Sequence, residues 1–368
     1  MIRLRDISED TALFPWKKST PYPAIQSTIA VALALLVGQL TGHQSAASIA
    51  AGSAFTVGFA VFHEAMASTL LSMGVLTLGI ASGTLAGSLG AHWTPLVLLL
   101  CVVAAVNYGF LAGLGNTAGW IGQQSAIFVI VSSYFANGVH YALGRSAMVM
   151  IGGALQMAIY ATSTMLRRHT ASGSPPVPPV WRQLGTRSRQ LWTCFRDELS
   201  WHADTTSYVL RLCITLALST ALYRHLHWRN GYWAPMTALL VLKPKWANTL
   251  SRGVARLTGT LVGAGVCALL ALHPLFAHST YFLLIAGTAC LCFALQAVNY
   301  ALFSAILTMY TVFLFAFGGF SERSAADLRL INTAVGGLLA LLVDFAALQI
   351  GSRFHPTSLP ASPTALEQ

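Results

Sequence analysis

Apolar runs of about twenty residues follow one another along almost the whole chain, and they restrict its fold more than any other feature. Charged residues make up 9% of the 368 residues and hydrophobic residues 55%, whereas an ordinary soluble domain carries roughly 25% charged residues. So few charges cannot cover the surface of a water-soluble fold of this size, and lipid must cover it instead. The sequence therefore predicts an all-α polytopic membrane protein.

The runs predict about twelve transmembrane helices in two groups of six, since one span needs about 20 apolar residues. In the first half the predicted spans are 24–41, 45–62, 68–90, 94–112, 121–136 and 143–166, and in the second half 207–226, 231–243, 254–272, 280–296, 299–318 and 327–350. The predicted divisions are a cytoplasmic N-terminal arm (1–23), a first six-helix repeat (24–166), a linker (167–206), a second six-helix repeat (207–350) and a cytoplasmic tail (351–368).

The linker has two distinct parts. Residues 172–180 are rich in proline and cannot be helical. In residues 181–199 the Trp, Leu and Phe residues fall on one helical face and the Arg residues mostly on another. This pattern predicts an amphipathic helix on the inner leaflet, and an elbow leading into the seventh span fits it equally well.

The formal net charge of +10 does not indicate nucleic acid as a partner. If the N-terminus is cytoplasmic, most of the 21 Lys and Arg residues fall on or near the inner side of the predicted spans. This positive-inside distribution explains the basic charge without a polyanion. The first 23 residues are too polar for a cleavable secretory signal, so the first apolar run is expected to be a retained span. The charge distribution and the even number of spans predict that both termini are cytoplasmic.

Several kinds of chemistry have no matching motif. Five of the six cysteines lie in apolar segments, and Cys290-x-Cys292 has no His or Cys at metal-binding spacing, so neither a disulfide framework nor a zinc site is expected. His63-Glu64 lacks the second histidine of a zinc helix, and there is no phosphate-binding loop or nucleophilic serine elbow. We expect no enzyme activity, metal or cofactor.

The two halves share sequence patterns. Residues 142–155 and 326–339 both read Ala-x-x-Arg, then six residues, Gly-Gly-x-Leu. Residues 83–87 and 259–263 both read Gly-Thr-Leu-x-Gly. The patterns predict an internal duplication, and because each half has an even number of spans, the repeats should be parallel and related by an axis along the membrane normal. The spaced glycines predict close helix packing, rather than a conduit lining.

A basic loop follows the eighth predicted span. Pro244 ends that span, and Lys243, Lys245, Arg252 and Arg256 surround one short loop on the inner side. Such a cationic funnel raises the local concentration of anions, so these four residues are candidate substrate contacts. Positive-inside topology alone also places basic residues here.

Aromatic residues flank the same span. Tyr232 and Trp233 precede it and Trp246 follows it. Their rings are candidate contacts for an aromatic substrate, and a membrane-interface belt is the alternative.

Three further ionisable residues are candidates. Arg145 and Arg329 stand at equivalent places near the outer ends of the sixth and twelfth spans. They could snorkel to the headgroups or form an outer ring for leaving anions. Asp344 lies well inside the twelfth span, so it is a candidate proton-coupling group. The alternatives are an ion pair with Arg211 and snorkelling to the inner surface.

The stretch from Gly231-Tyr-Trp to the Arg256-x-x-Gly-Thr-Leu-x-Gly core resembles the fusaric acid resistance family. That family overlaps the bacterial aromatic acid exporters and is related to plant aluminium-activated malate transporters. The resemblance implies efflux of aromatic carboxylates across a bacterial inner membrane, driven by the proton motive force or the membrane potential, often with a periplasmic adaptor protein. The chain departs from the pattern in its short linker and in its first half, where His63 and Glu64 stand in place of the basic residues.

Three hypotheses result for the function. The leading one is a secondary exporter of small organic anions, most of all aromatic carboxylic acids. A passive organic-anion channel is the first alternative, and a non-transporting scaffold or accessory subunit is the second. A homo-oligomer is compatible with all three.

Overall fold

The structure is a computed structural model that describes residue 11 and residues 13–63, 68–135, 137–170, 203–270, 278–319 and 322–354. In these ranges the chain is helical and contains no β-strand. The proline-rich segment, the predicted amphipathic helix at 181–199, most of the predicted tail, and residues 1–10 and 12 of the N-terminal arm lie outside the described residues.

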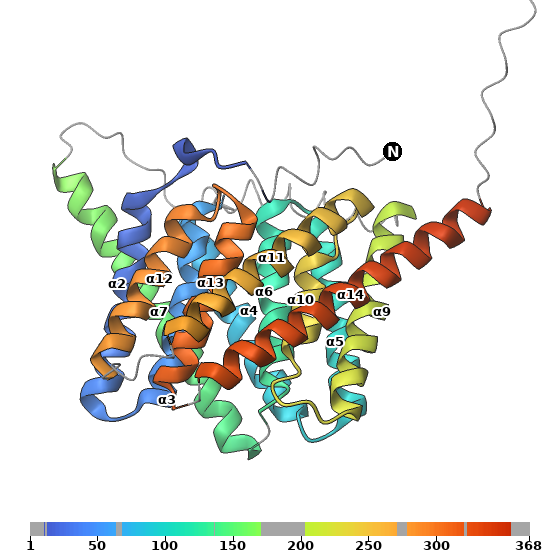
Figure 1. The fold of residues 1–368 in the computed structure, drawn as a ribbon. Coiled ribbons are helices and arrows are strands. Elements are labelled where there is room, and N and C mark those ends of the chain that lie inside the picture. Colours follow the sequence, from blue (N-terminus) through green and yellow to red (C-terminus); the bar gives the residue numbers. More distant parts are fainter. Residues whose placement is uncertain are drawn as a thin grey trace, which may run out of the picture.

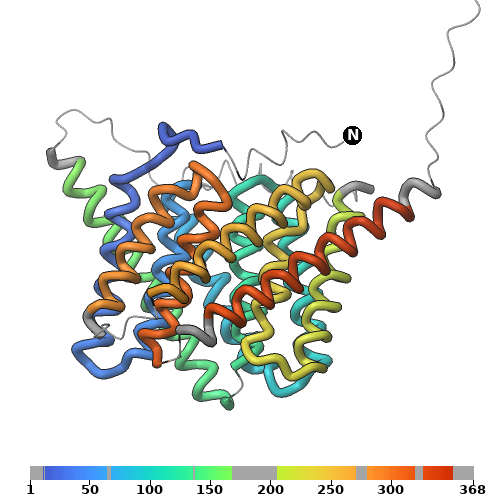
Figure 2. Tube along the Cα trace, viewed as in Figure 1, coloured from blue at the N-terminus to red at the C-terminus, as the bar shows by residue number. Residues whose placement is uncertain are grey.

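The helices form a bundle, and the start of α2, the end of α7, the start of α9 and the end of α14 point toward the same face (Figures 1 and 2). The elements are η1 (Trp16–Lys18), α2 (Pro21–Thr41), α3 (Gln44–Gly58), η2 (Phe59–Phe62), α4 (Thr69–Gly90), α5 (Thr94–Gly113), α6 (Asn116–Ser132), α7 (Gly138–Thr170), α9 (Ala203–His225), α10 (Trp233–Val241), α11 (Trp246–Leu270), α12 (His278–Leu295), α13 (Tyr300–Phe317) and α14 (Glu322–Phe354).

Each predicted span overlaps one observed helix. The largest difference is at α11, which begins at Trp246 instead of residue 254. The polar residues of its first two turns were predicted as loop. They continue the helix beyond the apolar stretch because the hydroxyl of Thr249, bonded to the backbone of Lys243, closes the turn that precedes it.

Nine of the helices that the structure describes are long and apolar enough to cross a membrane. Helix α12 contains a shorter apolar stretch, Thr280–Leu295. Helix α10 has nine residues, which makes it about 13 Å long at 1.5 Å per residue, against a hydrocarbon core of about 30 Å. The prediction of an all-α polytopic membrane protein is confirmed, and the number of twelve spans stays a prediction.

The outer surface of the bundle is apolar. Leu78, Leu269 and Leu283 on three different helices are 62%, 65% and 68% exposed. Many other large apolar side chains are exposed on the same helices, which is unusual for a protein surrounded by water. Lipid is the environment that fits this surface.

Corresponding helices of the two halves pack in the same way. Helix α4 packs on α6 and α7, and α11 packs on α13 and α14. Helix α3 packs on α7 as α10 packs on α14, and α5 packs on α6 as α12 packs on α13. Contacts of α12 with α2 and of α5 with α9 join the halves.

Glycines permit the close approaches in both halves. A side chain at Gly83 would meet the backbone carbonyl of Ser125, and one at Gly259 would meet that of Ala301. The packing interpretation of these glycines is confirmed, because their missing side chains leave room for the backbone of the next helix.

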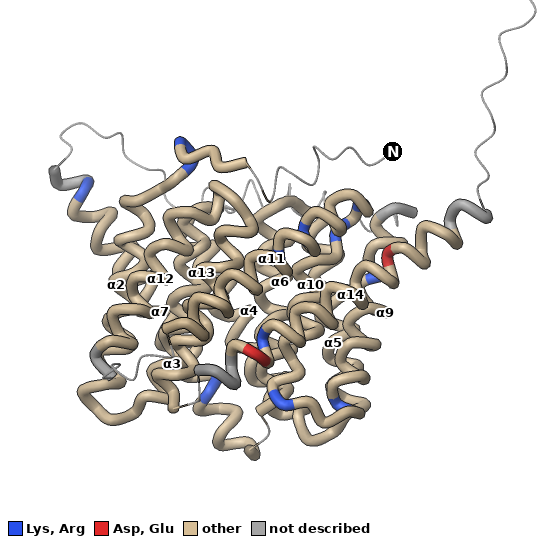
Figure 3. The backbone as a smooth tube through the Cα atoms, in the orientation of Figure 1, with Lys and Arg blue, Asp and Glu red and all other residues tan. Residues whose placement is uncertain are grey.

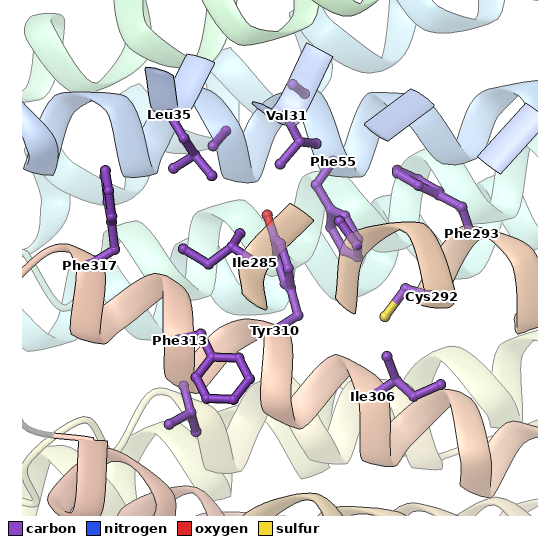
Figure 4. Close-up of a cluster of buried hydrophobic side chains, with 14 of the residues drawn as sticks. Val31, Leu35, Phe55, Ile285, Cys292, Phe293, Ile306, Tyr310, Phe313 and Phe317 are labelled. Atoms are coloured by element: carbon purple, nitrogen blue, oxygen red, sulfur yellow. The ribbon is translucent and has the colours of Figure 1, made fainter. Parts of the chain in front are cut away.

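An aromatic cluster fills one of the joins between the halves. The ring of Phe55 on α3 stacks on that of Tyr310 on α13 with centroids 4.1 Å apart, and lies 5.1 Å from Phe293 on α12. Leu35 on α2 and Phe317 on α13 belong to the same buried cluster (Figure 4). Stacked rings add about 0.5–1.5 kcal/mol per pair beyond the area they bury, so the cluster holds the two halves together.

We expect Gly259→Leu to prevent assembly of the bundle. The added side chain overlaps the carbonyl of Ala301 and the side chain of Ser304, and such overpacking costs about 1–3 kcal/mol or more. The matched control is Gly265→Leu on the same helix, where a side chain meets no atom within 4 Å. Thermal stability and size-exclusion profiles in detergent measure both variants, and equal profiles for the two would contradict the packing role.

Candidate functional site

The short helix α10 places two aromatic side chains inside the protein. Tyr232 and Trp233 at its start are 1% and 2% exposed. The interface-belt alternative is therefore wrong for both residues, because a belt residue reaches the surface of the bundle. Trp233 also makes an edge contact with Phe315, whose ring centroid lies 5.6 Å away.

Arg329 lies against this aromatic pair. Its guanidinium carbon is 5.1 Å from the centroid of the Trp233 ring, and it lies within electrostatic range of Tyr232. The side chain is 2% exposed. It does not reach toward the headgroups, so the snorkelling alternative does not fit Arg329.

A second buried arginine lies near the first. Arg256 on α11 is 1% exposed, and its backbone carbonyl accepts a hydrogen bond from the hydroxyl of Ser304 at 3.3 Å. Its guanidinium acts electrostatically on that of Arg329. Both positive charges thus lie inside the helix bundle, where the repulsion between them is unfavourable.

Neither buried arginine has its charge balanced by a described residue. The Nε atoms of Arg256 and Arg329 have no hydrogen-bond partner among the described atoms. Of the two acids whose side chains are described, Asp327 is exposed and Asp344 is paired with Arg211. An unpaired charge in a low-dielectric interior is strongly unfavourable, so the pair fits a bound anion.

Arg224 differs from this pair because its guanidinium forms hydrogen bonds to several helices. It donates to the carbonyl of Ser133 at 3.2 Å, to the carbonyl of Ala91 at 2.6 Å and to the hydroxyl of Thr94 at 3.1 Å. These bonds join α9 to the ends of three other helices. The contrast with Arg256 and Arg329 indicates that the buried pair is not there to hold helices together.

Three buried polar side chains lie on α10 and on the two helices that carry Arg256 and Arg329. Thr237 on α10, Thr260 on α11 and Asn332 on α14 are at most 1% exposed. An oxygen of each has no hydrogen-bond partner among the described atoms. Thr260 and Asn332 follow Arg256 and Arg329 by about one turn, which places them on the same helix faces. The hydroxyls of the two threonines can donate to an anion.

Of the four residues predicted around the basic loop, Lys243 and Lys245 lie in the loop between α10 and α11, whereas Arg252 and Arg256 lie on α11. Lys245 is exposed, and Lys243 and Arg252 are half-buried. The guanidinium of Arg252 lies 4.1 Å from the centroid of the Tyr300 ring. Trp246 packs on Phe345 of α14, with centroids 6.0 Å apart. Lys and Arg residues are sparse along the helices themselves (Figure 3).

Asp344 forms an ion pair with Arg211. The carboxylate is fully buried and one oxygen accepts from Arg211, while the other has no partner among the described atoms. Arg211 also donates to the carbonyl of Pro244 at 3.0 Å. The pair predicted as the alternative is therefore present, and it joins α9 and α14 to the basic loop.

Arg145 occupies the place in the first half that Arg329 occupies in the second. It is half-buried, and its guanidinium carbon is 4.2 Å from the centroid of the Phe135 ring and 5.6 Å from that of Tyr141. Like Arg329, it lies within electrostatic range of Tyr232. The sequence indicated both arginines but not that one tyrosine lies near both.

Together, the apolar helices and the buried arginines define the class of the protein as a multi-pass membrane protein with cationic side chains inside its helix bundle. Residues 216–343 match the model of the family described as fusaric acid resistance protein-like, and the predicted resemblance is confirmed over this segment. It contains Tyr232, Trp233, Arg256 and Arg329. The proteins of this family are transporters.

Two curated proteins are similar to part of the chain. A Neisseria gonorrhoeae protein described as uncharacterized protein ORF2 is 26% identical over 152 residues, which are 41% of this chain and 36% of that protein. An uncharacterized Haemophilus influenzae protein is 27% identical over 155 residues, 40% of this chain and 21% of that protein. The matches thus span about a third and a fifth of these relatives. No solved structure matches the chain.

The first-half loop that corresponds to the basic loop holds a half-buried histidine. The ring of His63 stacks on that of Trp120 with centroids 4.3 Å apart, and its Nδ1 lies 3.0 Å from the carbonyl oxygen of Phe59. Burial lowers the pKa of His63 below its ordinary value, and the contact with Phe59 opposes this shift in part. Glu64 lies outside the described residues.

We expect His63 to make the fold less stable at acidic pH. Because its pKa is lower in the folded than in the unfolded protein, the unfolded chain takes up the proton more readily as the pH falls through about 6.5. The stability that neutral His63 contributes is present above that pH and is lost below it. Melting curves in detergent between pH 8 and pH 5 should decline less steeply for His63→Phe, which keeps a stacking ring. Parallel curves for the two proteins would contradict this expectation.

Proposed function

We propose that the protein exports small organic anions, aromatic carboxylates above all. The observation that carries the proposal is the buried pair Arg256 and Arg329, whose charges no described acid balances. A carboxylate between them would supply the missing charge, and the Trp233 ring beside Arg329 offers a flat apolar surface to an aromatic group.

In this proposal, the chain crosses a bacterial inner membrane twelve times as two parallel six-helix repeats with both termini in the cytoplasm. The shared packing of the halves and the paired glycine contacts support the duplication. Lys243, Lys245 and Arg252 form the cytoplasmic entrance and attract anions to it. A periplasmic adaptor protein and a homo-oligomer are compatible with this arrangement.

The membrane potential favours export. A monovalent anion leaving an inside-negative cell gains about 2.3 kcal/mol per 100 mV, so proton coupling is not required for efflux. A passive organic-anion channel is therefore the alternative function. A scaffold without transport activity is the second alternative, and the unbalanced arginine pair argues against it, because a structural role would give those charges partners.

We expect Arg256→Gln to abolish protection of cells against toxic aromatic acids. Loss of one charge-assisted contact to a carboxylate, about 1.5–3 kcal/mol, lowers binding about tenfold or more. The control is Arg229→Gln, which removes an exposed arginine. Growth in the presence of benzoate, at matched protein levels, compares the two variants in a strain that lacks the protein. If the Arg256 variant protects as well as the control, the arginine pair is not the transport site.

We expect Asp344 to couple transport to protons. At zero membrane potential, an imposed pH gradient should drive accumulation of benzoate in proteoliposomes with the wild-type protein and not with Asp344→Asn. Potential-driven flux should remain, because it needs only the arginine pair. Asp327→Asn, which changes an exposed acid of the same helix, is the control. Absence of pH-driven accumulation in the wild type would favour the passive channel and exclude Asp344 from the mechanism.

A further inference from the structure

A row of aromatic rings connects Arg329 with Arg145. The Trp233 ring lies under the guanidinium of Arg329 at 5.1 Å, and the Tyr232 centroid is 5.5 Å from that of Trp233. The Phe135 centroid is 5.9 Å from that of Tyr232, and the guanidinium carbon of Arg145 is 4.2 Å from Phe135. Each ring thus contacts the next, with an arginine at both ends.

This row crosses from the second half of the chain to the first. Arg329 and Trp233 belong to α14 and α10, whereas Phe135 follows α6 and Arg145 lies on α7. Helices α6 and α10 are in contact. The contact between the two halves is therefore lined by aromatic rings, with Arg329 at one end of the row and Arg145 at the other.

Three polar atoms along the row have no hydrogen-bond partner among the described residues. They are the Nε atoms of Arg145 and Arg329 and the hydroxyl of Tyr232. Tyr232 lies within electrostatic range of both arginines. The hydroxyl and the two guanidinium groups are donors, so what they lack is an acceptor with negative charge.

An aromatic carboxylate has both properties that this row would recognise. Its carboxylate accepts from a guanidinium and a phenol hydroxyl, and its ring packs on the faces or edges of Phe135 and Tyr232. An aliphatic carboxylate meets the first requirement only. The row of aromatic rings therefore favours binding of aromatic carboxylates over aliphatic carboxylates of the same charge.

We propose that Arg145 and Tyr232 form a second station for aromatic carboxylates, which receives the anion from the buried pair Arg256 and Arg329. The proposal rests on the transport function proposed above. Within this second station, Tyr232 lies on the side of the buried pair and donates its hydroxyl to the carboxylate. The first half thus contributes a residue to the pathway even though the basic loop belongs to the second half.

The competing explanation is that Arg145 only stabilises the ring packing. A cation over an aromatic face contributes about 0.5–2 kcal/mol, and Arg145 also donates to the hydroxyl of Tyr141 at 3.4 Å. In that case its loss would lower stability and leave transport per folded molecule unchanged. The two explanations therefore differ in a measurable way.

The test compares Arg145→Gln, Arg145→Lys and Arg167→Gln. Arg167 is the matched control because it lies on the same helix and also over a tyrosine ring, that of Tyr22 at 3.4 Å, while its side chain is exposed. For each purified protein, equilibrium dialysis in detergent measures binding of radiolabelled benzoate. Efflux of benzoate and of cyclohexanecarboxylate is measured in proteoliposomes and normalised to folded protein.

We expect Arg145→Gln to bind benzoate within about twofold of the wild type and to export it about tenfold more slowly, the effect of losing one charge-assisted contact. Arg145→Lys should restore most of the rate, and Arg167→Gln should match the wild type. Phe135→Leu should reduce the preference for benzoate over cyclohexanecarboxylate.

Two results would overturn the second station. One is a normalised efflux rate of Arg145→Gln within twofold of the wild type, and the other is an unchanged benzoate preference in Phe135→Leu. A wild-type protein that neither binds nor moves benzoate would instead count against the proposed function itself, so the two failures are distinguishable.

Discussion

A charge that stays inside a membrane protein needs a partner, and this requirement separates the arginines of the structure into two groups. Arg211 and Arg224 are held by a carboxylate and by backbone carbonyls, and they join helices to one another. Arg256 and Arg329 are buried more deeply and have no such partners among the described residues. The first group explains how the bundle holds together, and the second is the basis of the proposed anion site.

The two halves share their packing but not their charges. The glycine contacts that bring α4 onto α6 recur between α11 and α13. Counted back from the corresponding glycines, the position of Arg256 is occupied in the first half by Ile80, which is fully buried. Arg145 and Arg329, in contrast, occupy equivalent places in both halves. The fold thus repeats its helix packing, whereas the buried arginine of α11 has no counterpart in the first half.

Much of the fold could be predicted from the sequence because each membrane span depends on the composition of one short stretch of residues. The lengths of the apolar runs predicted the helices, and Pro244 predicted that α10 ends shortly before it. The start of α11 was missed because polar residues in its first turns resemble a loop. The burial of Arg329 and Trp233 could not be predicted, since it depends on how α10, α11 and α14 pack. Arg256 could be predicted as a candidate because it follows a basic loop in the sequence. Its electrostatic interaction with Arg329 could not be predicted, because the two residues are far apart in the chain.

Three linked contacts connect the end of α10 with α9 and α14. Beyond its last turn, the carbonyl of Leu242 accepts from the hydroxyl of Tyr208 at 3.4 Å, and that of Pro244 accepts from Arg211. Both donors lie on α9, and Arg211 holds Asp344 on α14 as well. A displacement of α9 would have to break all three contacts at once. Helices α9 and α14 and the loop after α10 are therefore expected to move together at this end of the bundle.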